Sequence, residues 1–254
     1  MQDNKNAMGI SNSEIKLVRS LSMKKFRDSL GLFTVEGDKL VAEAMKSGFH
    51  VEKIYRSSEI GEEMMKKISL LSTPSPVLAV VKKPSQDETD EAQVARPAKG
   101  LYLALDSIRD PGNLGTILRI ADWFGIDGIF ATPDTVDLYN PKTVQSTMGA
   151  IFRVRFAYAN LERFADLAIN SGGIVYGTFL DGDNIYDTDL QTGDKAPVVV
   201  VIGNEANGIS AKMEKKVGSR LYIPPYPDGN TGSESLNAAV ATAITVAEFR
   251  RRGR

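Results

Sequence analysis

Hydrophobic positions follow two periods along the first third of the chain and divide it into short helices and strands. Apolar residues recur at helical spacing over 15–21, 38–47 and 62–71, and short apolar runs occupy 32–35, 51–55 and 77–81. A spacing of three and four residues predicts helices, and short apolar runs bounded by polar residues predict strands. We therefore predict a small α/β domain over residues 11–83.

The pattern stops at residues 84–99, PSQDETDEAQVARPAK. Acidic residues, glutamine and two prolines accumulate there, and no apolar periodicity remains. Such composition is typical of a segment that buries little apolar surface. We predict a linker at 84–99.

The alternation of apolar strand patterns with helical patterns is stronger after the linker. Apolar strand candidates are 101–105, 128–131, 174–179, 198–202 and 221–223, and helical patterns lie between and after them at 114–124, 142–150, 161–170, 211–217 and 236–250. Continuous apolar strands separated by helices indicate a parallel sheet that is covered on both faces. We predict an α/β domain over 100–254, with a ligand site beyond the carboxyl ends of its strands.

Composition narrows the chemistry. Hydrophobic residues make up 42% of the chain, and there is no cysteine and a single histidine, His50. Without cysteine the chain has no disulfide, thiolate nucleophile or thiolate metal ligand, and with one histidine we expect no zinc site. No apolar run could span a membrane, and the start lacks the pattern of a signal peptide, so we expect a cytoplasmic protein. We expect His50 to be a surface or packing residue.

Runs of lysine and arginine are the places where a nucleic acid could bind, because the chain as a whole carries a formal charge of only −1. Each run has two interpretations, a phosphate-binding patch or an ordinary solvated surface. The runs comprise Lys24, Lys25 and Arg27; Lys66 and Lys67; Lys82 and Lys83; and Arg250, Arg251, Arg252 and Arg254.

The first candidate loop lies within LALDSIRDPGNLGTILRIADWFG, residues 103–125. Asn113 stands at the expected start of a helix, where it could cap the helix or contact a ligand. Arg119 lies off the apolar stripe of that helix, on the side of Gly115 and Trp123, where it could meet a ligand or be an ordinary surface cation.

The second loop follows the apolar strand in VVVVIGNEANGIS, residues 198–210. Gly203 comes directly after that strand, and a glycine there lets a ligand lie against bare backbone. Glu205 could accept hydrogen bonds from a hydroxyl, an amine or Arg119. Alternatively, it closes a turn or caps the next helix.

The third loop, in LYIPPYPDGNTGSESLNAAVATAITVAEF, residues 221–249, leads into a helix that is apolar on nearly every side. Such a helix is buried in a core or in a subunit interface. At its start, Ser235 and Asn237 could present a hydroxyl and an amide to a ligand, or could cap the helix.

Together the three loops resemble the signature motifs of the SpoU (TrmH) family of RNA 2'-O-ribose methyltransferases, in the SPOUT superfamily. The first motif is similar to NLGTILRIADWFG with Asn113 and Arg119, and the second to IGNEANGIS with Gly203 and Glu205. The third appears as Ile223, Pro224, Ser235, Leu236 and Asn237. Residues 140–156 resemble the family's connecting segment, and 33–48 resemble the start of a substrate-binding domain that often precedes the catalytic one.

The resemblance implies a catalytic domain with a C-terminal trefoil knot and S-adenosyl-L-methionine as the methyl donor. It assigns activation of the ribose 2'-hydroxyl to Arg119, although an arginine has a pKa above about 12 and is an awkward base. The residues that it assigns to organising the site are Asn113, Glu205, Ser235 and Asn237. The residues that it assigns to the methyl donor are Thr178, Gly203, Ile223 and Leu236.

The family also works as a homodimer on RNA, and the N-terminal domain favours ribosomal RNA over transfer RNA. The sequence departs from the family pattern in two places. Pro225 follows Pro224, and residues 225–234 make the third loop longer than usual, so the rim of the donor pocket is expected to differ. The N-terminal domain carries few substrate signals.

Two other classes of protein fit parts of the pattern. A dinucleotide-dependent oxidoreductase would share the parallel sheet, but no GxGxxG follows the first strand of the domain and no Walker sequence occurs. A non-catalytic RNA-binding protein on the same fold would be expected to lose Asn113, Arg119 or Glu205, and all three are present. A transfer RNA methyltransferase is the alternative within the family.

Overall fold

The computed structural model describes residues 9–84, 97–227 and 235–253. The chain forms two compact units. Unit 1 comprises Met1–Pro84 together with Asp137–Arg153, and unit 2 comprises Ser85–Val136 together with Val154–Arg254. The predicted linker falls largely on 85–96, and most of the long third loop falls on 228–234, outside the described residues.

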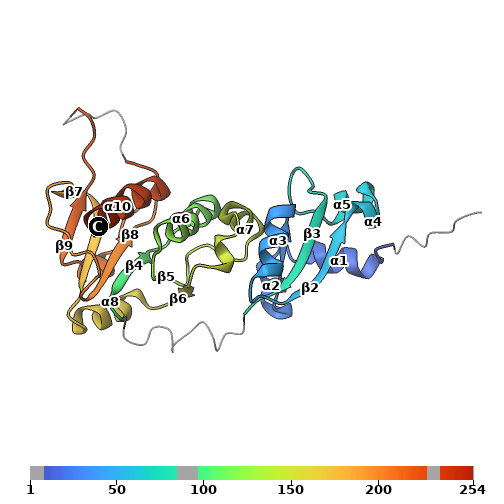
Figure 1. Cartoon of the computed structure of the whole chain (residues 1–254), viewed down its shortest axis with the longest axis horizontal. Coiled ribbons are helices and arrows are strands. Elements are labelled where there is room, and N and C mark those ends of the chain that lie inside the picture. Colours follow the sequence, from blue (N-terminus) through green and yellow to red (C-terminus); the bar gives the residue numbers. More distant parts are fainter. Residues whose placement is uncertain (1–8, 85–96, 228–234, 254) are drawn as a thin grey trace, which may run out of the picture. The chain divides into compact units, whose positions relative to one another are not determined.

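Unit 1 is built on an antiparallel sheet of three strands (Figure 1). The strands lie in the order β1-β3-β2, with Leu32 opposite Lys82 in the first pair. Its elements are α1 (Asn12–Ser20), α2 (Lys24–Leu30), β1 (Leu32–Glu36), α3 (Asp38–Lys46), β2 (Val51–Arg56), α4 (Ser57–Ile60), α5 (Glu62–Ile68), β3 (Val77–Lys82), α7 (Pro141–Thr147) and a 3₁₀ turn (Ala150–Phe152).

The sequence explains the local order of this unit. Ser11 and Glu14 form a capping box that starts α1. One face of the sheet is closed by apolar side chains of α1 and α5 that pack on β2 and β3. These side chains are Val18, Leu21, Tyr55, Met65, Ile68, Leu78 and Val80.

The segment 137–153 packs with unit 1, although the apolar pattern grouped it with the C-terminal part of the chain. Tyr139 contacts Phe33 of β1, with ring centroids 4.8 Å apart, and Phe152 contacts Phe49 at 5.1 Å. Arg27, 1% exposed, forms an ion pair with Asp137. Arg27 is therefore a structural residue, and the interpretation of it as part of a basic surface patch is wrong.

Unit 2 contains a six-stranded parallel sheet with the order β6-β5-β4-β8-β7-β9. Its elements are β4 (Gly100–Leu105), α6 (Pro111–Phe124), β5 (Gly128–Ala131), β6 (Phe156–Tyr158), α8 (Leu161–Asn170), β7 (Ile174–Asn184), β8 (Pro197–Ile202), α9 (Ala211–Glu214), β9 (Ser219–Tyr222) and α10 (Ala238–Arg252). The predicted α/β class with a parallel sheet is confirmed.

Helices cover both faces of this sheet (Figure 1). On one face, Phe164 of α8 packs on Tyr102 and Phe130 of the strands. On the other face, Phe249 of α10 contacts Tyr176 of β7, with ring centroids 5.2 Å apart. Successive residues of a strand point to opposite faces, so strands buried on both faces are apolar throughout.

Helices α6 and α10 run side by side in the same direction. Their first turns meet where Asn237 contacts Asn113, and their last turns meet where Arg250 donates hydrogen bonds to the carbonyl oxygens of Phe124 and Gly125. Arg252 donates to the carbonyls of Thr188, Ile185 and Tyr186. The basic C-terminal run therefore makes hydrogen bonds between α10 and neighbouring segments. Arg254 lies outside the described residues.

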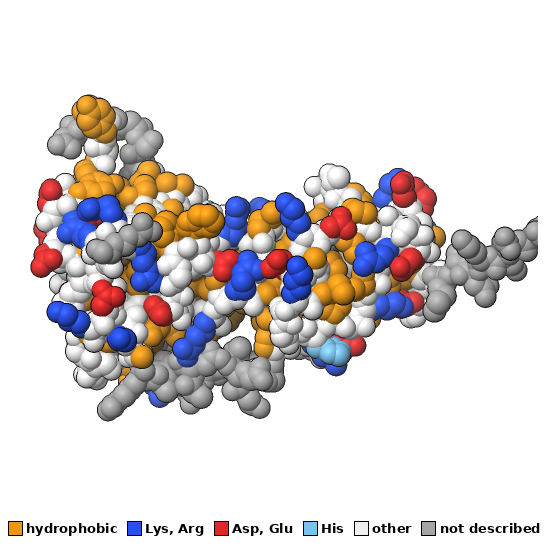
Figure 2. All heavy atoms as spheres, viewed as in Figure 1, with side chains coloured by type: hydrophobic (Ala, Val, Ile, Leu, Met, Phe, Trp, Pro, Cys, Tyr) orange, Lys and Arg blue, Asp and Glu red, His pale blue; other side chains and the backbone are white. Residues whose placement is uncertain are grey.

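Charges of both signs are interspersed on the face that Figure 2 shows. Among the basic runs, Lys24 and Lys83 pair with Asp28, Lys66 pairs with Glu63, and Lys82 pairs with Glu52. His50 is exposed near Glu52. In the described ranges no helix is long and apolar enough to cross a membrane, and no cluster of acidic or histidine side chains could hold a metal ion.

Candidate active site

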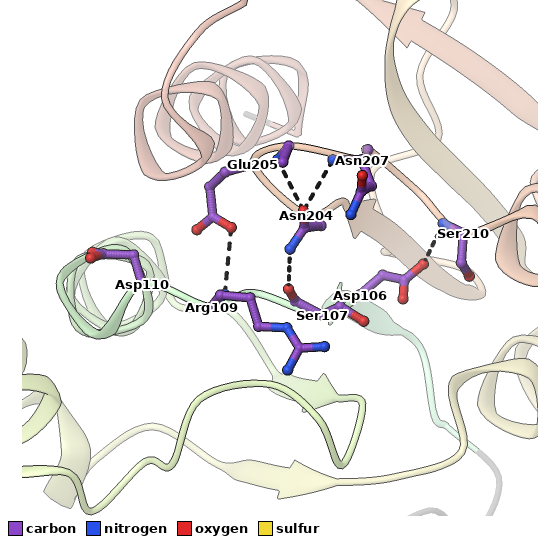
Figure 3. Close-up of a pocket in the computed structure, with 10 residues that line it drawn as sticks. Asp106, Ser107, Arg109, Asp110, Asn204, Glu205, Asn207 and Ser210 are labelled. Atoms are coloured by element: carbon purple, nitrogen blue, oxygen red, sulfur yellow. Dashed lines mark hydrogen bonds between the residues drawn. The ribbon is translucent and has the colours of Figure 1, made fainter.

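A cavity of about 620 Å³ opens at the carboxyl ends of β4 and β8 in unit 2 (Figure 3). The two strands are parallel neighbours, and their last residues, Leu105 and Ile202, lie opposite each other. The loops that leave them face each other across the cavity. Its lining residues are Asp106, Ser107, Arg109, Asp110, Asn204, Glu205, Ala206, Asn207, Gly208 and Ser210.

Asp110 caps helix α6 and leaves the side chain of Asn113 free for the site. The Asp110 carboxylate accepts a hydrogen bond from the Asn113 backbone N–H at 2.8 Å, and Pro111 occupies the first turn. The capping role that the sequence suggested for Asn113 therefore belongs to Asp110. The Asn113 side chain instead donates from Nδ2 to Oε1 of Glu205 at 2.7 Å.

Asn237 extends this contact to a third element. Its Nδ2 donates to Oδ1 of Asn113 at 2.9 Å, while its Oδ1 accepts from the N–H groups of Ala239 and Val240 in the first turn of α10. The sequence left helix capping and a contact in the site as alternatives for Asn237. Its side-chain amide does both. The structure thus joins three predicted site residues in a chain from Asn237 through Asn113 to Glu205.

The loop that carries Glu205 is a tight turn built on Gly203 and Asn204. Asn204 and Gly208 exchange backbone hydrogen bonds at 2.9 Å, and Asn204 Oδ1 accepts from the N–H groups of Ala206 and Asn207. A Cβ on Gly203 would lie 2.3 Å from the carbonyl carbon of Gly208. Only glycine fits where the backbone returns so closely on itself.

Three further hydrogen bonds hold this turn against the β4–α6 loop. Asn204 Nδ2 donates to the Ser107 carbonyl at 2.7 Å, the Ser210 N–H donates to Asp106 at 2.7 Å, and the Arg109 N–H donates to Glu205 at 3.4 Å (Figure 3). Glu205 is therefore oriented by both loops. Asp106 and Ser107 were not singled out from the sequence, although a polar pair directly after a buried strand was available as a signal.

Ser107 has a left-handed backbone, with φ of 62°, which is uncommon for a residue with a side chain. Its N–H donates to Thr132, and its hydroxyl donates to Asp134 at 2.8 Å. Hydrogen bonds from the hydroxyls of Thr132 and Ser107, together with the charge of Arg109, hold the pKa of Asp134 below its ordinary value of 3.8. Such strained residues held by several contacts are concentrated at functional sites.

Arg119 lies on the exposed side of α6, one turn before Trp123. Within the described residues its guanidinium has no hydrogen-bond or ion-pair partner, so the contact with Glu205 that the sequence allowed is not made. Gly115, one turn earlier, is buried rather than open to a ligand. Ser235 is exposed and likewise has no hydrogen-bond partner in the described ranges.

The four residues predicted for the methyl donor belong to neighbouring elements. Thr178 lies within β7, directly after the last pair of that strand with β8, while Gly203 directly follows β8 and Ile223 directly follows β9. The Thr178 hydroxyl donates to the Val201 carbonyl at 3.2 Å. Leu236, 47% exposed, precedes α10.

Comparison with known proteins places these features in a family. Residues 100–247 match the model of the SpoU rRNA Methylase family, and residues 12–63 match the MRM3-like substrate binding domain. The first match alone covers more than half of the chain.

Individual relatives and solved structures agree with these matches. A 23S rRNA guanosine 2'-O-methyltransferase of Bacillus subtilis, RlmP, is 32% identical over 94% of this chain and 96% of its own. Mitochondrial rRNA methyltransferase 3 of Homo sapiens is 27% identical over 91% of this chain and 70% of its own. An AdoMet-bound rRNA methyltransferase from Sinorhizobium meliloti is 30% identical with a TM-score of 0.82, each chain being covered over 96% of its length.

The family models, the similar proteins and the solved structures thus all confirm the predicted family resemblance. The two loops that line the cavity, and Asn237 of the third loop, lie inside the residues matched by the methylase model. The chain belongs to the SpoU rRNA Methylase family.

Proposed function

We propose that this protein transfers the methyl group of S-adenosylmethionine to a ribose 2'-hydroxyl of ribosomal RNA. The observation that carries the proposal is the chain of hydrogen bonds from Asn237 through Asn113 to Glu205, set at the carboxyl ends of parallel strands. It unites one residue from each of the three signature motifs. RlmP and mitochondrial rRNA methyltransferase 3 both act on ribosomal RNA by their names, which favours ribosomal over transfer RNA.

The residues around the strand ends fit the methyl donor. Gly203 exposes backbone beside a turn that no larger residue could form. Thr178 lies in β7 where the pairing of that strand with β8 ends, and Ile223 directly follows the neighbouring strand β9. Backbone groups of Thr178, Gly203, Ile223 and Leu236 would hold the nucleoside and the methionine part. When bound, S-adenosylmethionine supplies an electrophilic methyl group whose sulfonium leaving group departs neutral, so the reaction needs no metal.

The protein must then position a ribose and assist the loss of the proton of its 2'-hydroxyl to water. Arg119 is a cation on an exposed helix face, with no partner in the described residues that would compete for a phosphate or ribose. We assign it the orientation and activation of the hydroxyl, through charge and hydrogen bonding. Asn113 and Asn237 fix the Glu205 carboxylate, and Ser235 offers an exposed hydroxyl beside them.

A non-catalytic RNA-binding protein on the same fold is the second candidate. It would have no need for a carboxylate that is oriented by the Asn113 amide and the Arg109 N–H in a cavity. A transfer RNA methyltransferase would use the same site and the same chemistry on a different RNA. The choice of RNA therefore depends on unit 1 and its substrate-binding segment.

We further propose a homodimer with a trefoil-knotted catalytic domain over 100–254, preceded by a substrate-binding domain over 11–83. The support for the dimer is apolar exposure on α6 and around the start of α10. Trp123 is 86% exposed, and Leu236 and Val240 are each 47% exposed. Exposed apolar groups of this size favour a subunit contact. Similarity to a bacterial rRNA methyltransferase and the lack of cysteine support a cytoplasmic location.

Calorimetric titration with S-adenosylmethionine tests the cofactor assignment, with NAD as the control ligand. We expect about one site per chain for S-adenosylmethionine and no heat of binding for NAD. Gly203→Val should abolish the binding, because its side chain would occupy the space of the Gly208 backbone. Binding of NAD in place of S-adenosylmethionine would contradict the proposal.

A further inference from the structure

Unit 1 contains a hollow of about 490 Å³ that lies outside the catalytic cavity. Its walls come from the end of α1, the loop between α5 and β3, and the start of α7. Segments more than a hundred residues apart in the sequence therefore build it. The residues that line it are Arg19, Ser22, Ser69, Leu70, Leu71, Ser72, Asn140, Pro141 and Lys142.

The chemistry of this lining suits an anion. It includes two cations, Arg19 and Lys142, three serines and an asparagine, and no carboxylate. The hydroxyls of Ser22 and Ser69 already donate to the Arg19 carbonyl and to Glu36, so positive charge is what mainly suits the hollow to an anion. Glu36, which contacts two of the lining residues, is only 4% exposed: the Ser69 hydroxyl donates to it at 2.6 Å and the Leu70 N–H at 2.7 Å. Burial raises the pKa of Glu36.

Arg19 is held in place at the rim. Its Nη1 donates to the Lys67 carbonyl at 2.9 Å, at the end of α5. In the described part of the chain its other guanidinium nitrogens have no partner. A guanidinium that is fixed by one hydrogen bond and open on its other edge is well prepared for a phosphate, which it can bind through two N–H groups.

One buried residue fixes the two walls relative to each other. Arg27 donates from Nη1 to the Leu21 and Ser22 carbonyls at 2.8 and 2.9 Å, and from Nε to Asp137 at 2.9 Å. It thus joins the wall at Ser22 to the segment that carries Asn140 and Lys142. Arg27 therefore links two of the segments that wall the hollow.

We propose that this hollow binds a backbone phosphate of the RNA substrate, as a second RNA contact outside the catalytic cavity. The inference rests on the proposed function, since it names where that RNA is held. Phosphate contacts position a nucleic acid without reading its bases, and hydroxyl and cationic side chains are the groups that make them. The contact would place the RNA while the chemistry proceeds in unit 2.

Salt-dependent RNA binding by the full-length protein tests the proposal. The variants are Arg19→Gln, Lys142→Gln and the double variant, with ribosomal RNA as the probe. Removal of one cation that binds a phosphate lowers the slope of log affinity against log salt by about 0.7 to 0.9. We expect the double variant to lower this slope by about one and to raise the KM for RNA roughly tenfold. Turnover at saturating RNA and the Kd for S-adenosylmethionine should stay unchanged.

The matched control is the double variant Arg56→Gln/Lys66→Gln, which removes the same two kinds of charge from exposed positions of unit 1 outside the hollow. Arg19→Lys/Lys142→Arg keeps both charges and should retain the wild-type slope. Equal slopes for the hollow and control variants, or an effect confined to turnover, would overturn the proposal. RNA binding is measured without methyl transfer, so failure of the proposed chemistry would be seen separately, as a wild-type protein that binds RNA and transfers no methyl group.

Discussion

The side-chain amide of Asn113 donates a 2.7 Å hydrogen bond to the carboxylate of Glu205, 92 residues away in the chain. Asn113 belongs to the first turn of α6 and Glu205 to the turn after β8, so the contact closes two loops over one cavity. Asn237 adds a third loop by donating to the other side of the same amide. The donor and acceptor of Asn113 are thus both used, which fixes its orientation and that of Glu205.

Exchanging the donor and acceptor of this contact gives a direct test. Asn113→Asp keeps an acceptor for Asn237 but places a carboxylate against Glu205, and the repulsion of the two charges should lower methyl transfer at least tenfold. Combining Asn113→Asp with Glu205→Gln restores a donor and an acceptor in reversed order. We expect the double variant to recover activity relative to Asn113→Asp if orientation is what matters. Activity of the single variant equal to that of the wild type would exclude a role for the contact.

Arg119 should be required for turnover and dispensable for folding. Its side chain is exposed and has no partner in the described ranges, so Arg119→Ala removes no internal contact. We expect turnover to fall by about a hundredfold or more, the range for loss of a proton-transfer or charge-stabilising group. Thermal unfolding and S-adenosylmethionine binding report on the fold and the donor site. Arg163→Ala, at an exposed position of α8, is the matched control, and similar turnover in both variants would refute the assignment.

Glu248 should make the stability of unit 2 depend on acid pH. Hydrogen bonds from Arg251 and Arg252 lower its pKa from 4.5 to about 2, although burial opposes this. Its carboxylate is therefore more acidic in the folded than in the unfolded chain, and its stabilisation is complete above about pH 4.5 and is lost as the pH falls toward 2. Glu248→Gln should lower the free energy of unfolding by about 1 to 3 kcal/mol at pH 7.

Urea unfolding of the wild type and of Glu248→Gln at pH 7, 4 and 3 measures this effect. The difference between the two proteins should shrink as the pH falls. Glu63→Gln, which breaks an exposed ion pair with Lys66, is the control and should change stability little at any pH. A constant difference from pH 7 to pH 3 would show that the Glu248 charge does not contribute.

Trp123 should contribute to a subunit contact. Replacing this largely exposed indole by glutamate places a charge where the proposed interface is apolar. We expect Trp123→Glu to convert a dimer into a monomer in light scattering at micromolar concentration. Met45→Glu, at an exposed apolar residue of unit 1, should leave the dimer intact. A wild-type protein that is already monomeric would contradict the proposed assembly.

The strands and most helices could be predicted because apolar periodicity carries their signal. Strand 128–131 and helix 161–170 have the predicted bounds, and the other predicted strands differ only at their ends. Helices α2 and α4 and strand β6 were missed. In and just before α2, Met23, Phe26 and Leu30 leave their apolar side chains exposed, so they mark no core-facing stripe. Strand β6 has only three residues.

The sequence could not show which residues of distant segments contact each other. Arg27 stands in a run of cations and is buried, because its partner Asp137 lies 110 residues further along the chain. Asn113 stands where a cap is expected, and only the position of Asp110 shows that the cap is made elsewhere. The family motifs, by contrast, could be recognised because each keeps its residue types within a single loop, and the first two also keep their spacing.

The most direct test is transfer of tritiated methyl from S-adenosylmethionine to ribosomal RNA isolated from cells that lack this protein, followed by digestion to nucleosides. The account predicts label in one 2'-O-methylated nucleoside of ribosomal RNA, none in transfer RNA, and none with Arg119→Ala. Label on a base, label in transfer RNA alone, or no label with a folded protein that binds S-adenosylmethionine would contradict it.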